Sequence, residues 1–135
     1  MGFRRTTPWL RSRLEPLEPR LLLSGTTFVV DSLADDIAAD GVVTLREALE
    51  AANTNAAVFD APAGSAAEVD LITFDPALTA AGPVDIATTA ELLVADDVEI
   101  RGPGAELLAL DGGQTHRVMR IEAGVNAVLS SFTIT

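Results

Sequence analysis

The sequence predicts a mainly β fold in which one short α-helix precedes a series of short strands. Brief apolar runs follow one another through residues 69–134, and Gly, Pro and Asp residues typical of turns separate them. Within several runs apolar and polar residues alternate, which indicates strands with one buried face. The segment around Leu45 instead repeats its apolar residues at helical spacing. A β-sandwich, a β-barrel and a parallel β-helix all fit this pattern.

The composition narrows the function classes. At 135 residues the chain is long enough for one modest domain, and without Cys it has no disulfides, thiolate metal sites or Cys nucleophiles. The net charge of −11 is uneven, because residues 1–24 contain five Arg against two Glu, whereas residues 25–135 contain four Arg against eighteen acidic residues. Since so acidic a body repels phosphate backbones, we expect no nucleic-acid partner.

Residues 1–24 form a basic leader, which we expect to be disordered because Pro16 and Pro19 disfavour a helix there. The apolar run at 21–23 is far shorter than the roughly 20 residues of a transmembrane helix. It is also shorter than the roughly 7–15 apolar residues of a signal-peptide core. No other segment approaches those lengths, so the sequence predicts no transmembrane span.

The end of this leader resembles the LEPR-XLL motif, which occurs near the start of very large bacterial surface and exported proteins. The matching residues follow one another without a gap: Leu14, Glu15, Pro16, Leu17, Glu18, Pro19, Arg20, Leu21, Leu22, Leu23 and Ser24. In that family the motif is taken to be a sorting or export element. The resemblance therefore implies an extracytoplasmic protein, secreted or held at the cell surface, and implies no chemistry.

A capping box predicts where the helix begins. The hydroxyl of Thr44 can accept the backbone N–H of Glu47, and the Glu47 carboxylate can accept the N–H of Thr44. The apolar residues of the helix recur at i, i+3, i+4 and i+7 as one stripe: Leu45, Ala48, Leu49 and Ala52. Because a helix of about ten residues is marginal alone, this stripe must dock on other elements. Arg46 and Glu50 are expected to pair on its flank.

The strand, acidic turn and helix of residues 28–53 resemble the CSLREA region of bacterial proteins. The matching residues are Thr44, Leu45, Arg46, Glu47, Ala48, Ala51, Ala52 and Asn53. Val43 stands at the usual Cys position, which removes any thiol role, and Thr44 stands where Ser is common. In that family the region precedes β-helical repeats, often of the polymorphic outer-membrane-protein kind.

The acidic turn before the helix also has partial calcium-loop spacing. Asp36, Asp40, Gly41 and Glu47 occupy positions 1, 5, 6 and 12 of such a loop. Ala38 at position 3 cannot ligate, and the capping box already uses Glu47. Two interpretations stay open: a calcium site with Asp36, Asp40 and Glu47 as candidate ligands, or a solvated acidic turn beside a helix N-terminus.

The expected strands after the helix lie at 69–74, 84–86, 92–94, 98–100, 107–110, 118–121, 125–129 and 132–134, and residues 56–68 form a loop. Three features favour a parallel β-helix. The links are short and lack Asn-Gly hairpin signals. Ile100, Ile121 and Ile134 recur at intervals of 21 and 13, near one turn and part of a turn. A helix precedes the strands, where a solenoid needs its apolar end covered.

Four further stretches resemble CSLREA-linked β-helix proteins, namely residues 71–78, 98–105, 117–121 and 129–135. This resemblance implies a right-handed parallel β-helix with a capping helix. The expected organisation is a leader at 1–24, the strand, turn and helix at 25–60, and the first coils at 61–135. Because the sequence stops within a strand pattern, we expect a part of a larger protein, with an uncapped end open to edge-to-edge self-association.

No convergent catalytic motif is visible. His116 is the single His, and it has no identifiable partner in the sequence. Some β-helix enzymes cleave acidic polysaccharides with paired carboxylates, or with calcium and Arg, which makes Asp96, Asp97, Asp111 and Arg120 the residues to examine. Their spacing does not indicate one site, so we expect no catalytic residues and no enzyme activity.

The sequence therefore predicts a non-catalytic N-terminal module of an exported, adhesin-like surface protein. Its expected partners are cell-envelope components, glycans or other surface proteins. The alternatives are a part of a polysaccharide-acting β-helix enzyme and a calcium-stabilised binding module, with calcium the one candidate cofactor.

Overall fold

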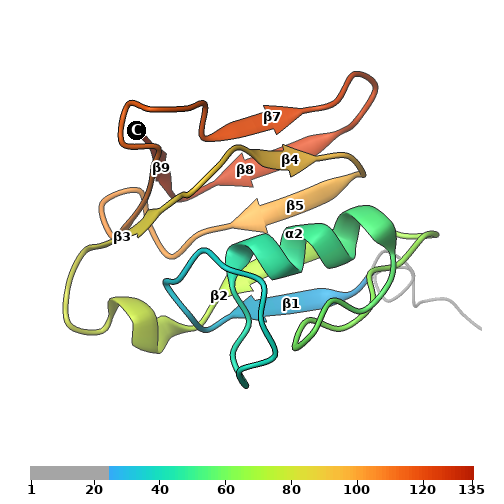
Figure 1. The fold of residues 1–135 in the computed structure, drawn as a ribbon, viewed down its shortest axis with the longest axis horizontal. Helices are drawn as coiled ribbons and strands as arrows, with labels where there is room; N and C mark the ends of the chain where they lie inside the picture. The colour runs from blue at the N-terminus through green and yellow to red at the C-terminus, as the bar shows by residue number, and fades with distance from the viewer. Residues whose placement is uncertain (1–24) are drawn as a thin grey trace, which may run out of the picture.

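The computed structural model describes residues 25–135 (Figure 1). The predicted leader, with its sorting residues 14–24, lies outside this part. The described chain is mainly strands in parallel sheets with one α-helix, as the sequence predicts. Among residues 25–135 no helix has the length and apolar character needed to cross a membrane.

Three parallel sheets make up the fold. The first holds β1 (Thr27–Val30), β2 (Asp70–Phe74), β5 (Val98–Arg101) and β8 (Ala127–Ser130), in that order. The second holds β3 (Val84–Ala87), β6 (Leu108–Asp111) and β9 (Thr133–Ile134), and the third pairs β4 (Leu92–Val94) with β7 (Met119–Ile121). Each expected strand is confirmed within about two residues at either end, the usual uncertainty of strand boundaries.

From β2 onward, successive strands lie in different sheets. From β3 onward the chain visits the second, third and first sheets in turn, and then repeats that order through β9. From β2 onward a step from one strand to its neighbour in the same sheet takes 24 to 29 residues, as in the pairs Val84 with Leu108 and Val98 with Ala127. The step from β1 to β2, which includes α2, takes 44 residues, as in the pair Thr27 with Leu71. All six strand pairings in the described chain are parallel, which is inconsistent with a hairpin-built sandwich or barrel.

The register places apolar side chains one above another in the interior. Phe28, Ile72 and Ile100 follow each other across the first sheet, and all three are buried. Ile121 and Ile134 belong to the other two sheets. The spacing of 21 from Ile100 to Ile121 is therefore a step between sheets, and its interpretation as one full turn was wrong. The spacing of 13 from Ile121 to Ile134 is also a step between sheets, which agrees with part of a turn.

The helix α2 (Leu45–Thr54) has the predicted capping box at Thr44, and Asn55 ends it in the left-handed conformation. Its stripe is buried at every position, as expected: Leu45, Ala48, Leu49 and Ala52. The expected pair of Arg46 with Glu50 was wrong, because Arg46 reaches Asp35 in the acidic turn instead. A short 3₁₀ helix, η2 (Pro76–Thr79), follows β2.

Candidate functional site

The helix α2 lies along the free edge of β4, at the same end of the molecule as β1 (Figure 1). The opposite edge of β4 is paired with the next strand, since the N–H of Leu92 bonds the Val118 carbonyl and the Val94 carbonyl accepts from Glu122. Backbone groups of a strand alternate between its two sides. Glu91, Leu93 and Ala95 therefore direct theirs toward the helix.

Side chains from α2 meet these backbone groups one by one. Arg46 Nη1 donates to the Glu91 carbonyl at 3.3 Å, and Nη2 donates to the Ala90 carbonyl at 2.8 Å. About two helical turns further along the same face, Asn53 Nδ2 donates to the Leu93 carbonyl at 2.8 Å, and Asn53 Oδ1 accepts the Ala95 N–H at 2.9 Å. The helix thus supplies through two side chains the hydrogen bonds that a neighbouring strand would give.

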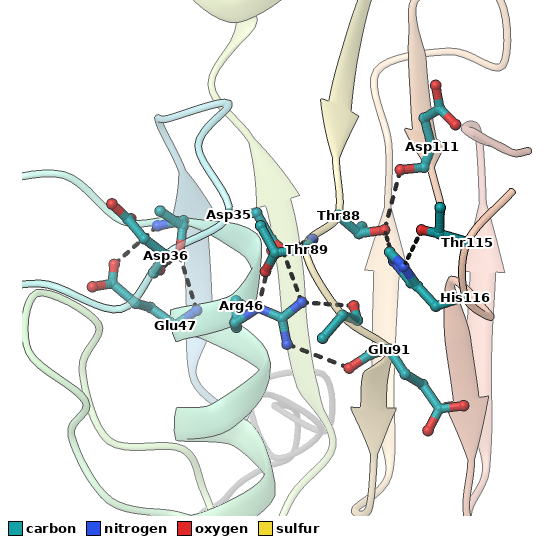
Figure 2. A network of polar contacts seen from close by, with 12 residues as sticks. Asp35, Asp36, Arg46, Glu47, Thr88, Thr89, Glu91, Asp111, Thr115 and His116 are labelled. Carbon is teal, nitrogen blue, oxygen red and sulfur yellow. Dashed lines mark hydrogen bonds and ion pairs between the residues drawn. The ribbon is translucent and has the colours of Figure 1, made fainter. Parts of the chain in front are cut away.

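The side chains that cover the edge of β4 are called the cap below, and Asp35 joins them from the acidic turn (Figure 2). Its carboxylate accepts Arg46 Nε at 3.1 Å and Nη2 at 2.8 Å, and it also accepts the backbone N–H and the hydroxyl of Thr89 at 2.6 and 3.0 Å. Its side chain is only 1% exposed. Burial alone would raise the pKa of Asp35, but the bonds from Arg46 and Thr89 outweigh burial and hold the pKa below its ordinary value.

Glu47 fixes the acidic turn to the start of the helix. One carboxylate oxygen accepts the N–H of Thr44 at 3.0 Å, and the other accepts the N–H of Ala38 at 2.9 Å. The Thr44 hydroxyl accepts from the N–H of Glu47 and donates to the Asp36 carbonyl at 2.7 Å. Glu47 is fully buried, and its charge is met by the backbone dipoles at the helix N-terminus.

Two of the three candidate calcium ligands lie together. Carboxylate oxygens of Asp40, Glu47 and Asp60 fall within 4.8 Å of one another. Asp60 comes from the loop after the helix, and its Oδ2 accepts the N–H groups of Asp40 and Gly41. Asp36 is not part of this group, whereas Asp60, which the loop spacing did not select, is.

His116 is partly buried and bridges two links between strands (Figure 2). Its Nε2 lies 2.9 Å from the Thr88 hydroxyl, and its Nδ1 lies 2.9 Å from the Thr115 hydroxyl. The Thr88 hydroxyl also donates to the Asp111 carbonyl at 3.1 Å. These contacts hold the link after β3 to the link after β6.

The residues considered for polysaccharide cleavage are held in separate local contacts. Asp96 accepts from Asn55, Asp97 accepts the N–H of Asn126, and the Asp111 carboxylate accepts the N–H of Gly113. Arg120 pairs with Glu91 and Glu122.

A groove between α2 and β4 encloses about 80 Å³, well below the roughly 300–1,000 Å³ of small-molecule sites.

Sequence reasoning missed several residues of the cap. Asp35 was one of several acidic residues in a turn, and Asn53 entered only through the resemblance to the CSLREA region. Thr89 and Asp60 carried no signal, because their partners lie 54 and 20 residues away. The expected strand at 92–94 has backbone N–H and carbonyl groups on both edges. The need for partners along its second edge was therefore a signal that the sequence did contain.

Comparison of the chain with protein-family models, with curated proteins and with solved structures finds no match. The resemblances to the LEPR-XLL motif and to the CSLREA region stay predictions from the residues themselves.

Proposed function

We propose that this chain is the capped first part of a right-handed parallel β-helix, and that it serves as a non-catalytic module of an exported, adhesin-like surface protein. The observation that carries this proposal is the way α2 satisfies the edge of β4. Arg46 and Asn53 bond the alternate backbone groups of that strand, while the apolar stripe covers the interior layer. This is what an end cap has to do.

The order of strands supports the β-helix. A coil that returns to the same three sheets every 24 to 29 residues stacks each strand on its counterpart one turn before. The interior then fills with columns of aliphatic side chains, such as Ile86 above Leu110. The right hand of the coil is the one implied by the resemblance, and it agrees with the strong preference of parallel crossovers.

The proposed surface location follows from the leader. The eleven residues from Leu14 to Ser24 carry the resemblance to a sorting motif, and the body after them is strongly acidic. Its partners would be cell-envelope components, glycans or other surface proteins. Cell fractionation of the chain with and without residues 14–24 tests this proposal. Export of the intact chain and retention of the shortened one support it, and retention of both in the cytoplasm overturns it.

A glycan-cleavage assay separates this proposal from the alternative of a polysaccharide-acting enzyme. The non-catalytic module leaves acidic glycans intact with and without calcium. Reproducible cleavage that is lost on Asp111→Asn, with Asp85→Asn as an exposed control on a neighbouring strand, would favour the enzyme instead.

Calcium stabilisation of the turn is a second candidate, favoured by the group of Asp40, Glu47 and Asp60. Three carboxylates from two loops and a helix could share one hard cation, for which oxygen ligands are preferred. Calorimetric titration with calcium tests it on the full chain. Heat of binding that disappears in Asp60→Asn and persists in Asp36→Asn supports the site, and no heat in the unaltered chain rejects it.

A further inference from the structure

Two Asp-Gly pairs occur in the chain, Asp40-Gly41 and Asp111-Gly112. At such a pair the glycine amide nitrogen can attack the aspartate side chain, because glycine has no Cβ to obstruct the approach. The product is a cyclic succinimide, which water opens to either aspartate or isoaspartate. The surroundings of the two pairs therefore decide which of them reacts.

The side chains of the two pairs are folded in the same way. Asp40 Oδ1 accepts the N–H of Val42 at 3.3 Å, and Asp111 Oδ1 accepts the N–H of Gly113 at 2.8 Å. Each bond turns the carboxyl group back toward the peptide that follows it, whose nitrogen is the attacking atom. The direction of the side chain is thus shared by the two sites and does not distinguish them.

The backbone at Asp40-Gly41 is held by one side chain. Both residues are exposed, and neither belongs to a helix or a strand. Their N–H groups donate to the same atom, Oδ2 of Asp60, at 3.0 and 3.1 Å. Gly41 has φ +86°, and an added Cβ there would meet no atom within 4 Å, so a ring has room to form. Rotation of this peptide breaks two bonds to one exposed carboxylate.

The backbone at Asp111-Gly112 is instead built into a sheet. Asp111 is the last residue of β6 and pairs with Ala87 of β3, and the N–H of Gly112 donates to the Thr135 carbonyl at 3.0 Å. Gly112 is buried, and an added Cβ there would lie 2.8 Å from the His116 carbonyl oxygen. Rotation of this peptide breaks bonds between strands, which open far less often than an exposed turn.

We propose that Asp40-Gly41 is a site of spontaneous isomerisation to isoaspartate, and that the fold protects Asp111-Gly112 from the same reaction. The Gly41 nitrogen bonds to Cγ of Asp40, and the amide proton leaves with the carboxyl hydroxyl as water. Water then adds to the main-chain carbonyl carbon of Asp40, and the bond from that carbon to nitrogen breaks. The water lost in the first step is regained in the second, so the reaction needs no cofactor.

Isomerisation changes the contacts of the acidic turn. The main chain then runs through the side-chain carbons of Asp40, which lengthens it by a methylene group, and the former main-chain carboxyl becomes the free one. Asp60 cannot keep both of the N–H groups that it accepts in the unmodified chain. The carboxylate of Asp40 also leaves the group that it forms with Glu47 and Asp60. The modification therefore uncouples the acidic turn from the loop after α2.

Peptide mapping of the aged 135-residue chain tests the proposal. Because the chain has no Lys, trypsin cleaves after Arg alone, which places Asp40 in fragment 21–46 and Asp111 in fragment 102–117. Isoaspartate has the same mass as aspartate, so it is detected by enzymatic methylation of its carboxyl group and located by fragmentation. The label should accumulate at Asp40 and stay absent from fragment 102–117. Equal label in the two fragments, or none at Asp40, overturns the proposal.

Two amide variants measure the rates at both sites. Asp40→Asn and Asp111→Asn form the same ring with loss of ammonia, and the gain in mass after hydrolysis follows each reaction without a label. Asp40→Asn should convert at least about tenfold faster than Asp111→Asn, because local opening limits the second site. In concentrated urea the two rates should converge, since the fold is what distinguishes them. Equal rates in the native chain, or an undiminished difference in urea, overturn the proposal.

Discussion

Asp35 and Arg46 form a two-point ion pair, 3.1 Å from Nε to Oδ1 and 2.8 Å from Nη2 to Oδ2, although they belong to different elements. The pair joins the acidic turn to α2. Both partners then reach the link between β3 and β4, Asp35 through Thr89 and Arg46 through the Ala90 carbonyl. Three segments are thereby fixed by one buried charge and its partner.

Loss of the guanidinium should destabilise the fold. Arg46→Gln leaves the carboxylate of Asp35 buried without its cation, which costs about 3 kcal/mol of the free energy of unfolding. Urea denaturation followed by circular dichroism measures this. The matched control is Arg101→Gln, whose pair with Glu99 is largely exposed and should cost less than about 1 kcal/mol. Equal losses in the two variants would contradict the role of the cap.

The same pair should make stability depend on pH in acid. Because the pKa of Asp35 is held below its ordinary value of 3.8, its contribution is present above that pH and is lost as pH falls through the lowered pKa. Asp35→Asn removes that dependence, so its unfolding free energy should fall less steeply below about pH 4 than that of the unaltered chain. Parallel curves for the two proteins would refute this assignment.

Asn53 should matter through both ends of its amide. Asn53→Ala removes the side-chain partners of the Leu93 carbonyl and the Ala95 N–H, at a cost of about 1 kcal/mol, because water can reach both exposed groups. Asn53→Asp keeps the acceptor and loses the donor, so its stability should lie between those of the unaltered chain and Asn53→Ala. Glu50→Ala, on the exposed flank of the same helix, is the control for helix propensity. Thermal unfolding ranks the variants.

Asp70 should hold the loop after α2 in place. It is 1% exposed, and its carboxylate accepts the N–H of Thr26 at 2.8 Å and that of Ser65 at 2.9 Å. Asp70→Ala leaves those donors unpaired and should cost roughly 2–3 kcal/mol. Asp85→Ala, at an exposed position of β3, should change stability by less than about 0.5 kcal/mol. A denaturant series that cannot separate the two would rule out this anchor.

Local chemistry made most of the elements predictable. The capping box needs only Thr44 and Glu47 three residues apart, and the strands follow from apolar runs bounded by Gly and Asp. The parallel pairing was favoured by short links without hairpin turns. These signals lie within a few residues of one another, so one sequence is enough to read them.

The site was less predictable because its contacts are long-range. Asp35 meets Thr89 across 54 residues, and Arg46 had an equally plausible partner in Glu50 on its own helix. Local spacing favoured that pair, but burial beside β4 gave Arg46 two carbonyls and a carboxylate at once. For the same reason the acidic group includes Asp60, which lies 20 residues after Asp40.

The side-chain cap on β4 has a consequence for the order of synthesis. Arg46 and Asn53 bond groups that lie 40 to 45 residues later in the chain. On a ribosome α2 therefore emerges well before the edge that it closes, and a helix of ten residues is marginal until then. Docking on β4 must wait until residue 95 has left the exit tunnel, so these contacts of α2 form only after β1 to β4 have been made.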